Sequence, residues 1–187
     1  NGVVTLGSGL GREGWQISAM GYDARWTATD QIPEGLIGQP DPHNPGRIFG
    51  RFDSLDPTTG GATSRHSLSG QWQQRDDNGQ TKVSAYAIRY ALDLYSNFEY
   101  LKADGSSAQF EQKDRRGVYG LAVSRSISHE LAGLNAVSEV GVQLRHDRGR
   151  VGLYDTDQRV RQATTRDDRF ELTQLGLHGQ TALELQP

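Results

Sequence analysis

The chain has 187 residues, of which 34% are hydrophobic, and 20 lysines and arginines against 23 aspartates and glutamates give a formal net charge of -3. Because the two signs are interspersed and no basic stripe follows the chain, the charge pattern argues against nucleic acid as a partner. The absence of cysteine excludes disulfides and thiolate metal sites. Low hydrophobicity and 23 glycines, with aromatic residues along most of the chain, favour a β-barrel with a wet interior over a disordered chain.

Alternation of apolar and polar residues recurs along the chain and predicts strands rather than helices. The first strand is expected at residues 15–26, with a change of parity near Ala19. A 36-residue loop, residues 27–62, follows it and holds five of the six prolines. A soluble compact domain rarely contains so long a loop, whereas an outer-membrane barrel has long extracellular loops.

The clearest strand is expected at residues 81–101, and its two faces differ in chemistry. One face carries aliphatic and aromatic side chains, which we expect to contact lipid: Tyr86, Ile88, Tyr90, Leu92 and Leu94. The other face carries the candidates for a lumen wall: Arg89, Asp93, Asn97 and Glu99. An arginine on the lipid face would cost about 2–4 kcal/mol near the midplane, which favours this assignment. The alternative for the polar face is an ordinary hydrated ladder of cross-strand partners.

A hairpin is expected to join this strand to a preceding one at residues 63–75. A three-residue connection, Asp77-Asn78-Gly79 with Gly79 in the left-handed region, would place Trp72 opposite Ser84 and Gly70 opposite Tyr86. In this register the apolar faces of the two strands coincide.

Further strands are expected at residues 116–125, 138–146 and 169–185, with a bulge near Thr173 because Phe170 and Leu172 have the other parity. The intervening connections, residues 102–115, 126–137 and 147–168, make long and shorter links alternate along the chain. This alternation is typical of barrels with long extracellular loops and short periplasmic turns.

No motif supports catalysis, a metal site or a bound cofactor. The glycines of residues 9–14 match G-x-G-x-x-G but precede a strand-like segment, which favours a turn over a nucleotide site. The five histidines show no zinc-binding spacing, and no G-x-S-x-G is present. We therefore expect no enzyme.

Several local strings, in order, resemble one branch of the TonB-dependent receptors over most of residues 15–180. They are WTATDQIP (26–33), SLSGQW (67–72), YSNFEY (95–100), QFEQKDRR (109–116), VGLY (151–154) and TTRDD (164–168). The resemblance implies that residues 1–187 are part of one transmembrane, antiparallel, up-and-down β-barrel domain, supplying six or seven of roughly 22 strands. The plug, the segment that engages TonB and the closing C-terminal strand would lie outside this sequence.

The same resemblance implies a place in the bacterial outer membrane and contact with its lipid. It also implies a partner complex containing TonB, driven by the inner-membrane proton gradient, and a small-molecule or metal-chelate ligand such as an iron–siderophore complex. No ligand residue can be carried over. Two alternatives remain open at this stage: a soluble all-β ligand- or carbohydrate-binding module, and a passive porin or adhesin barrel.

Overall fold

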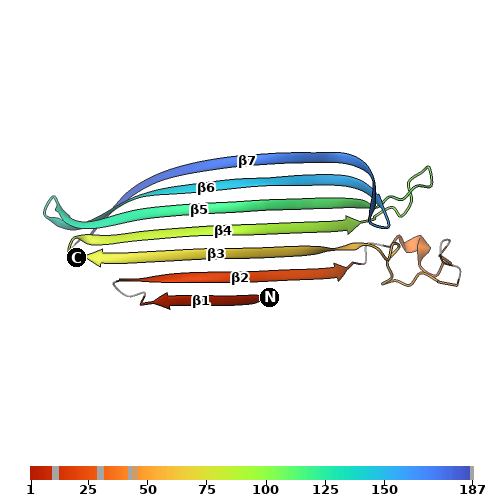
Figure 1. Ribbon diagram of the computed structural model, residues 1–187, viewed down its shortest axis with the longest axis horizontal. Coiled ribbons are helices and arrows are strands. Elements are labelled where there is room, and N and C mark those ends of the chain that lie inside the picture. Colours follow the sequence, from red (N-terminus) through yellow and green to blue (C-terminus); the bar gives the residue numbers. More distant parts are fainter. Residues whose placement is uncertain (10–12, 29–31, 42–43, 45, 186–187) are drawn as a thin grey trace.

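The protein is a single open sheet of seven antiparallel strands in the order of the chain, described by a computed structural model (Figure 1). The structure describes all residues except 10–12, 29–31, 42–43, 45 and 186–187. The strands are β1 (Gly2–Ser8), β2 (Glu13–Thr27), β3 (Gly60–Asp76), β4 (Gly79–Ser96), β5 (Phe110–Leu131), β6 (Leu134–Asp157) and β7 (Val160–Leu183). The all-β, up-and-down prediction is confirmed, and β1 and β7 form the two edges of the sheet.

Helical structure in the described residues is limited to one 3₁₀ turn, η1 (Glu34–Leu36), inside the long loop. Among these residues no helix is long and apolar enough to cross a membrane. The predicted turn at residues 9–14 includes residues 10–12, which lie outside the described part of the chain.

The connections differ at the two ends of the sheet (Figure 1). At one end, here called the turn end, β3 and β4 and then β5 and β6 are joined by two-residue turns. At the other, the loop end, lie residues 28–59, residues 97–109 and the tight β6–β7 turn, in which Gln158 and Arg159 both have positive φ. The prediction of a long loop after the first expected strand is therefore confirmed.

Two other predicted connections are wrong. Residues 126–137 and 147–168 are almost entirely strand, because β5, β6 and β7 are 22, 24 and 24 residues long. Only the part of residues 102–115 before Phe110 is a loop. Charged residues of these segments form cross-strand ion pairs, such as Arg150 with Asp167.

The predicted hairpin register is wrong by one residue. The β3–β4 turn contains Asp77 and Asn78 only, and Gly79 already pairs with Asp76. The carboxylate of Asp76 accepts a hydrogen bond from the backbone N–H of Asn78 at 3.0 Å, which stabilises the shorter turn. Trp72 consequently lies opposite Val83 rather than Ser84.

This register decides which side chains share a face, because directly opposed residues of an antiparallel sheet point to the same side. Tyr86 shares its side with Ser69 and Gly120, and Ala85 shares the other side with Gly70 and Leu121. The predicted register places Tyr86 opposite Gly70, on the apolar face that contains Leu68. In the sheet, Tyr86 lies on the opposite face from Gly70 and Leu68.

On one face, the turn-end half of every strand contributes to a continuous apolar surface, here called the apolar belt. Its members are Val4, Leu6, Trp15, Ile17, Leu68, Trp72, Val83, Ala85, Ala87, Tyr119, Leu121, Val123, Val140, Val142, Leu144, Leu175 and Leu177. Exposure of the large side chains reaches 78% for Leu177. We call this side of the whole sheet the belt face and the opposite side the groove face.

The groove face has the complementary pattern. In its turn-end half it carries hydroxyl, amide and charged side chains, including the hydrogen-bonded pairs Thr5–Ser18 and Gln16–Gln71. In its loop-end half it becomes aromatic and aliphatic, with Tyr90, Leu92 and Phe170 among its members. The apolar side therefore changes from one face to the other halfway along the strands.

This exchange explains the changes of parity seen in the sequence. β2 pairs regularly with both neighbours through Ala19, and β7 pairs regularly with β6 through Thr173, so the bulge predicted there is wrong. The irregularities of the β6–β7 pairing lie instead between Leu153 and Tyr154 and between Asp155 and Thr156. Regular strands simply cross the boundary between two differently patterned halves.

Candidate functional site

The groove face contains an open groove of about 630 Å³ near the middle of the sheet. Strands β3 to β6 supply its lining: Arg65, Tyr86, Ile88, Tyr90, Asp114, Arg116, Val118 and Arg145. All eight side chains lie on one side of the sheet by register. Val118 forms the buried floor, with 9% exposure.

Arg116 organises the centre of this groove. Its guanidinium pairs with the carboxylate of Asp114 and lies 5.9 Å from the ring centroid of Tyr90 and 5.7 Å from that of Phe170. Arg145 pairs in the same way with Asp147, at 2.8 Å. An arginine held over aromatic rings, as Arg116 is, offers both cation–π and hydrogen-bonding surfaces, which suit anionic or aromatic ligands.

Tyr86 owes its place in the groove to a glycine on the next strand. A Cβ atom at Gly120 would lie 2.3 Å from the Tyr86 ring, so only glycine lets the ring rest on β5. The sequence predicted an aromatic ring over a strand glycine, but over Gly70 instead of Gly120. The one-residue register difference accounts for the change of partner.

The residues predicted to face lipid all lie on the groove face. Tyr86, Ile88 and Tyr90 line the groove, and Leu92 and Leu94 continue toward the loop end. The sheet itself does not test lipid contact, and this assignment stays a prediction. The hairpin register that supported lipid contact at these residues is not the register of the sheet.

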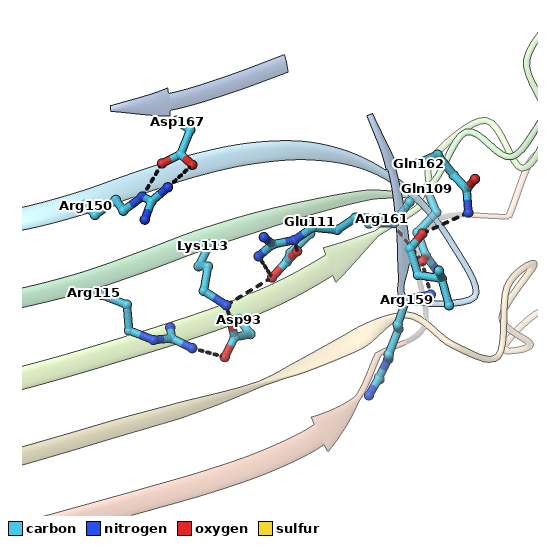
Figure 2. A network of polar contacts seen from close by, with 12 residues as sticks. Asp93, Gln109, Glu111, Lys113, Arg115, Arg150, Arg159, Arg161, Gln162 and Asp167 are labelled. Atoms are coloured by element: carbon cyan, nitrogen blue, oxygen red, sulfur yellow. Dashed lines mark hydrogen bonds and ion pairs between the residues drawn. The ribbon is translucent and has the colours of Figure 1, made fainter. Parts of the chain in front are cut away.

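The four candidates for the lumen wall are not brought together. Arg89 and Asp93 lie on the belt face, beyond the apolar belt. Asn97 is buried among the loops with 1% exposure, and Glu99 is exposed in the loop of residues 97–109. Asp93 pairs with Lys113 at 2.9 Å and with Arg115, as expected of a ladder of cross-strand partners (Figure 2).

The belt face is densely charged in its loop-end half (Figure 2). Arg161 donates two hydrogen bonds to Glu111, at 2.5 and 3.0 Å, and Lys113 lies 3.6 Å from the same carboxylate. Arg150 pairs through two nitrogens with Asp167. Such a surface is stable in water and is costly to transfer into hydrocarbon.

A second polar cluster joins the three connections at the loop end. Asp56 accepts hydrogen bonds from the side-chain amides of Asn97 at 3.0 Å and Gln109 at 2.8 Å. Gln109 in turn accepts from the hydroxyl of Thr156 at 2.9 Å and from the backbone N–H of Arg159 at 2.8 Å. This loop-end cluster therefore joins residues 28–59, residues 97–109 and the β6–β7 turn.

Sequence reasoning missed this cluster because nothing local marks it. Its members come from segments about 40 to 100 residues apart in the chain, as for Asp56 with Asn97 and Arg159 with Thr58. Amide and hydroxyl side chains in a proline-rich loop are equally common in solvated turns. Only the antiparallel order of the strands brings them to one end.

The pKa of Asp56 reflects its place in the cluster. Burial alone raises this pKa, but hydrogen bonds from Asn97, Thr58 and Gln109 to the carboxylate outweigh burial and hold the pKa below its ordinary value. The carboxylate therefore stabilises the cluster fully above the unfolded pKa of about 3.9, and this contribution is lost as pH falls through the lower folded pKa.

We expect the amide resonance of Thr58, which donates to Asp56 at 2.8 Å, to titrate with a midpoint below about 3.9 in the full-length protein. Nuclear magnetic resonance from neutral pH to pH 2 measures it. A midpoint at or above the value for a free aspartate would contradict the cluster.

Removing this carboxylate should loosen the loops. In Asp56→Ala we expect trypsin to cleave after the exposed Lys102 about tenfold faster, or roughly 1.4 kcal/mol of opening free energy, because buried amides lose a charged acceptor. Asp53→Ala is the matched control, since within the described residues the carboxylate of Asp53 accepts a hydrogen bond only from the backbone N–H of Gly50. Equal cleavage of both variants would refute the stabilising role of Asp56.

No group of acidic, histidine or cysteine side chains in the described residues could hold a metal ion. No known family model matches the chain, and neither a curated protein nor a solved structure is significantly similar to it. What the fold defines is therefore a class: one seven-stranded, antiparallel, up-and-down all-β sheet.

Proposed function

We propose that the chain forms part of the wall of an outer-membrane β-barrel, with its belt face toward lipid and its groove face toward the lumen. The single observation that carries this proposal is the exposed apolar belt, which runs across all seven strands and is backed by a polar face at the same height. A water-soluble sheet would need a second layer over so large an apolar surface.

The depth of the belt supports a membrane span. On β5 the belt covers Tyr119, Leu121 and Val123 and ends at Arg125, which pairs with Asp76. On β6 the belt face carries no charged residue over the eleven residues from Leu134 to Leu144, and a tilted strand needs about 9–11 residues to cross the hydrocarbon. Trp15 and Trp72 lie side by side at the turn-end border of the belt, and Tyr119 lies at the other border. Aromatic side chains at both borders suit the two membrane interfaces.

The belt also slants across the sheet. On β1 it lies at Val4 and Leu6, whereas on β7 it lies at Leu175 and Leu177, and a further apolar side chain, Leu183, follows on the same face beyond Gly179 and Thr181, nearer the turn end by register. Strands of a barrel tilt by about 35–45° from the membrane normal, so a level membrane must cross successive strands at shifting positions.

This orientation replaces the one expected from the sequence. If Tyr86, Ile88 and Tyr90 met lipid, their neighbours Arg65 and Arg116 would meet it too. Each would cost about 2–4 kcal/mol near the midplane. On the proposed orientation these arginines face the lumen, and the charged loop-end half of the belt face stands outside the membrane in water.

Within this class we propose an active-transport receptor, on the resemblance to TonB-dependent receptors. The loop end would face the outside, where it meets the ligand, and the groove with its three arginines would contact a small anionic solute or metal chelate on its way through the lumen. An iron–siderophore complex is the cargo that fits this resemblance. The proposed role is transport and not catalysis.

The cysteine-free sequence allows a direct test of the wall. Single cysteines at Leu121 and Leu175 should resist a water-soluble maleimide when the full-length protein is in membranes, and spin-labelled lipid should quench a fluorophore attached there. Cysteines at Ser124 and Gln143, on the groove face, should react with the maleimide. Equal labelling at all four sites would contradict the wall and favour a soluble binding module.

Transport needs its own test. Cells expressing the full-length protein should accumulate radiolabelled iron chelate, and a protonophore should abolish this uptake because it collapses the proton gradient. Uptake that persists with the protonophore would point to a passive porin. The absence of uptake for every chelate and nutrient class tested would contradict the transport proposal but not the proposed barrel wall.

A further inference from the structure

The belt face carries a concentration of arginines directly beyond the apolar belt, on its loop-end side. Arg89 and Arg148 lie in one cross-strand row with Gly117 between them, and Arg115, Arg150 and Arg169 lie side by side in the next. We call these five residues the arginine band. The same two rows contain only two carboxylates, Asp23 and Glu171, although the chain as a whole is acidic.

The arginine band is only partly neutralised by carboxylates of the sheet. Arg115 pairs with Asp93 and Arg150 with Asp167, but in the described part of the chain no carboxylate pairs with Arg89, Arg148 or Arg169. Of the two carboxylates of these rows, Asp23 lies 3.2 Å from His66, and Glu171, which is opposite Arg148 in the register, lies 3.6 Å from His146.

Like charges directly opposite one another destabilise a sheet, and Arg169, which pairs with no carboxylate in the described residues, lies directly opposite Arg150, so an added anion would relieve this repulsion. Arg115, Arg150 and Arg169 are direct cross-strand neighbours on β5, β6 and β7. Their guanidinium groups present several donors that match phosphate oxygens in paired hydrogen bonds.

The arginine band is continuous with the surface that would meet lipid. Arg148 lies over Tyr119, with its guanidinium carbon 5.7 Å from the ring centroid and a nitrogen 3.5 Å from the phenolic oxygen. Tyr119 is itself the border residue of the apolar belt on β5. An acyl chain lying on the belt would therefore bring its headgroup to the arginines.

We propose that the arginine band binds the phosphate groups of an anionic membrane lipid in the leaflet at the loop end of the sheet. This inference rests on the proposed function, since it requires the apolar belt to contact the acyl chains of the same lipid. It adds a lipid class to that function: a phosphorylated lipid whose charge the guanidinium groups neutralise.

The test titrates the full-length protein in detergent with a bis-phosphorylated glycolipid, with the same glycolipid lacking phosphates, and with inorganic phosphate. Native mass spectrometry measures binding. We expect tight binding of the phosphorylated lipid only. In the double variant Arg148→Gln, Arg169→Gln the affinity for this lipid should fall at least tenfold, whereas Arg148→Lys, Arg169→Lys should keep most of it because the charge remains.

Arg166→Gln is the matched control, because it removes one exposed arginine from the groove face and should leave binding unchanged. Equal binding by wild type and the double glutamine variant, equal loss in the control, or equal affinity for inorganic phosphate would each overturn the proposal. Quenching by spin-labelled lipid of the fluorophore at position Leu121 tests the proposed barrel wall independently of headgroup binding. Quenching without arginine-dependent lipid binding would refute this inference alone, and no quenching would refute the proposed function.

Discussion

Replacing Ala85 by arginine is expected to abolish assembly of the full-length protein in the outer membrane, whereas Ser84→Arg is expected to be tolerated. Ala85 lies in the middle of the apolar belt, with Gly70 and Leu121 as direct neighbours. An arginine at that depth costs about 2–4 kcal/mol when it faces lipid. Ser84 lies one residue away between Gln71 and Ala122 on the groove face, where water can hydrate the new charge.

The two substitutions are closely matched, since each replaces a small, exposed residue on the same strand. The measurement is the fraction of protein recovered in the outer membrane as the folded, heat-modifiable species. The opposite result, with Ser84→Arg defective and Ala85→Arg normal, would restore the lipid contact predicted for Tyr86 and Ile88. Normal assembly of both variants would contradict lipid contact on either face of the sheet.

The sequence predicted the class of fold because alternation is a local signal. Residues two apart along a strand share a face whatever their partners are, so the strands around Thr81, Tyr119, Val142 and Leu177 could be recognised without knowledge of the sheet. The long loop before β3 was also recognisable, since prolines and turn residues cannot continue a strand.

Register was not predictable, because it depends on one residue in the turn. A two-residue and a three-residue turn at Asp77 and Asn78 have almost equal local support, but they move every side chain of β4 to the other face relative to β3. The apolar run from Ile88 to Leu94 then favoured the wrong pairing, because it was assumed to continue the face of Leu68. In the sheet it belongs to the half where the apolar side has changed.

The groove and the arginine band were beyond sequence reasoning for the same reason. Arg65 and Arg116 meet at the groove through β4, and Arg115, Arg150 and Arg169 meet through the pairing of three strands. In the sequence these arginines lie on separate strands, and no local pattern links them. The groove and the arginine band form only where residues from several strands lie in the same cross-strand rows.

Arg161→Met is expected to lower the free energy of unfolding of the full-length protein by about 2 kcal/mol. The carboxylate of Glu111 is 1% exposed and receives two hydrogen bonds from Arg161, so the variant leaves a buried charge whose one remaining ion-pair partner among the described residues is Lys113. Wholly buried pairs lose about 3–5 kcal/mol in this way, and solvent screening of Arg161, which is 41% exposed, reduces the loss.

A double-mutant cycle isolates the pair. Glu111→Gln combined with Arg161→Met removes both charges and should recover part of the stability lost in Arg161→Met, as measured by urea unfolding of the refolded protein in lipid vesicles. Arg166→Met is the control, because Arg166 is 74% exposed and, in the described part of the chain, pairs only with Asp168 two residues along the same strand. Equal stability of the single and double variants would show that the carboxylate is solvated.

The pair acts between strands that are not neighbours. Glu111 lies on β5 and Arg161 on β7, so their hydrogen bonds cross over β6, and the ring of Tyr154 on β6 lies under the guanidinium at 3.6 Å from its carbon to the ring centroid. These strand ends would project beyond the membrane, where neither lipid nor a second layer supports them. We therefore expect Arg161→Met to increase hydrogen exchange first in residues 153–161, and to leave the apolar belt of β5 to β7 protected.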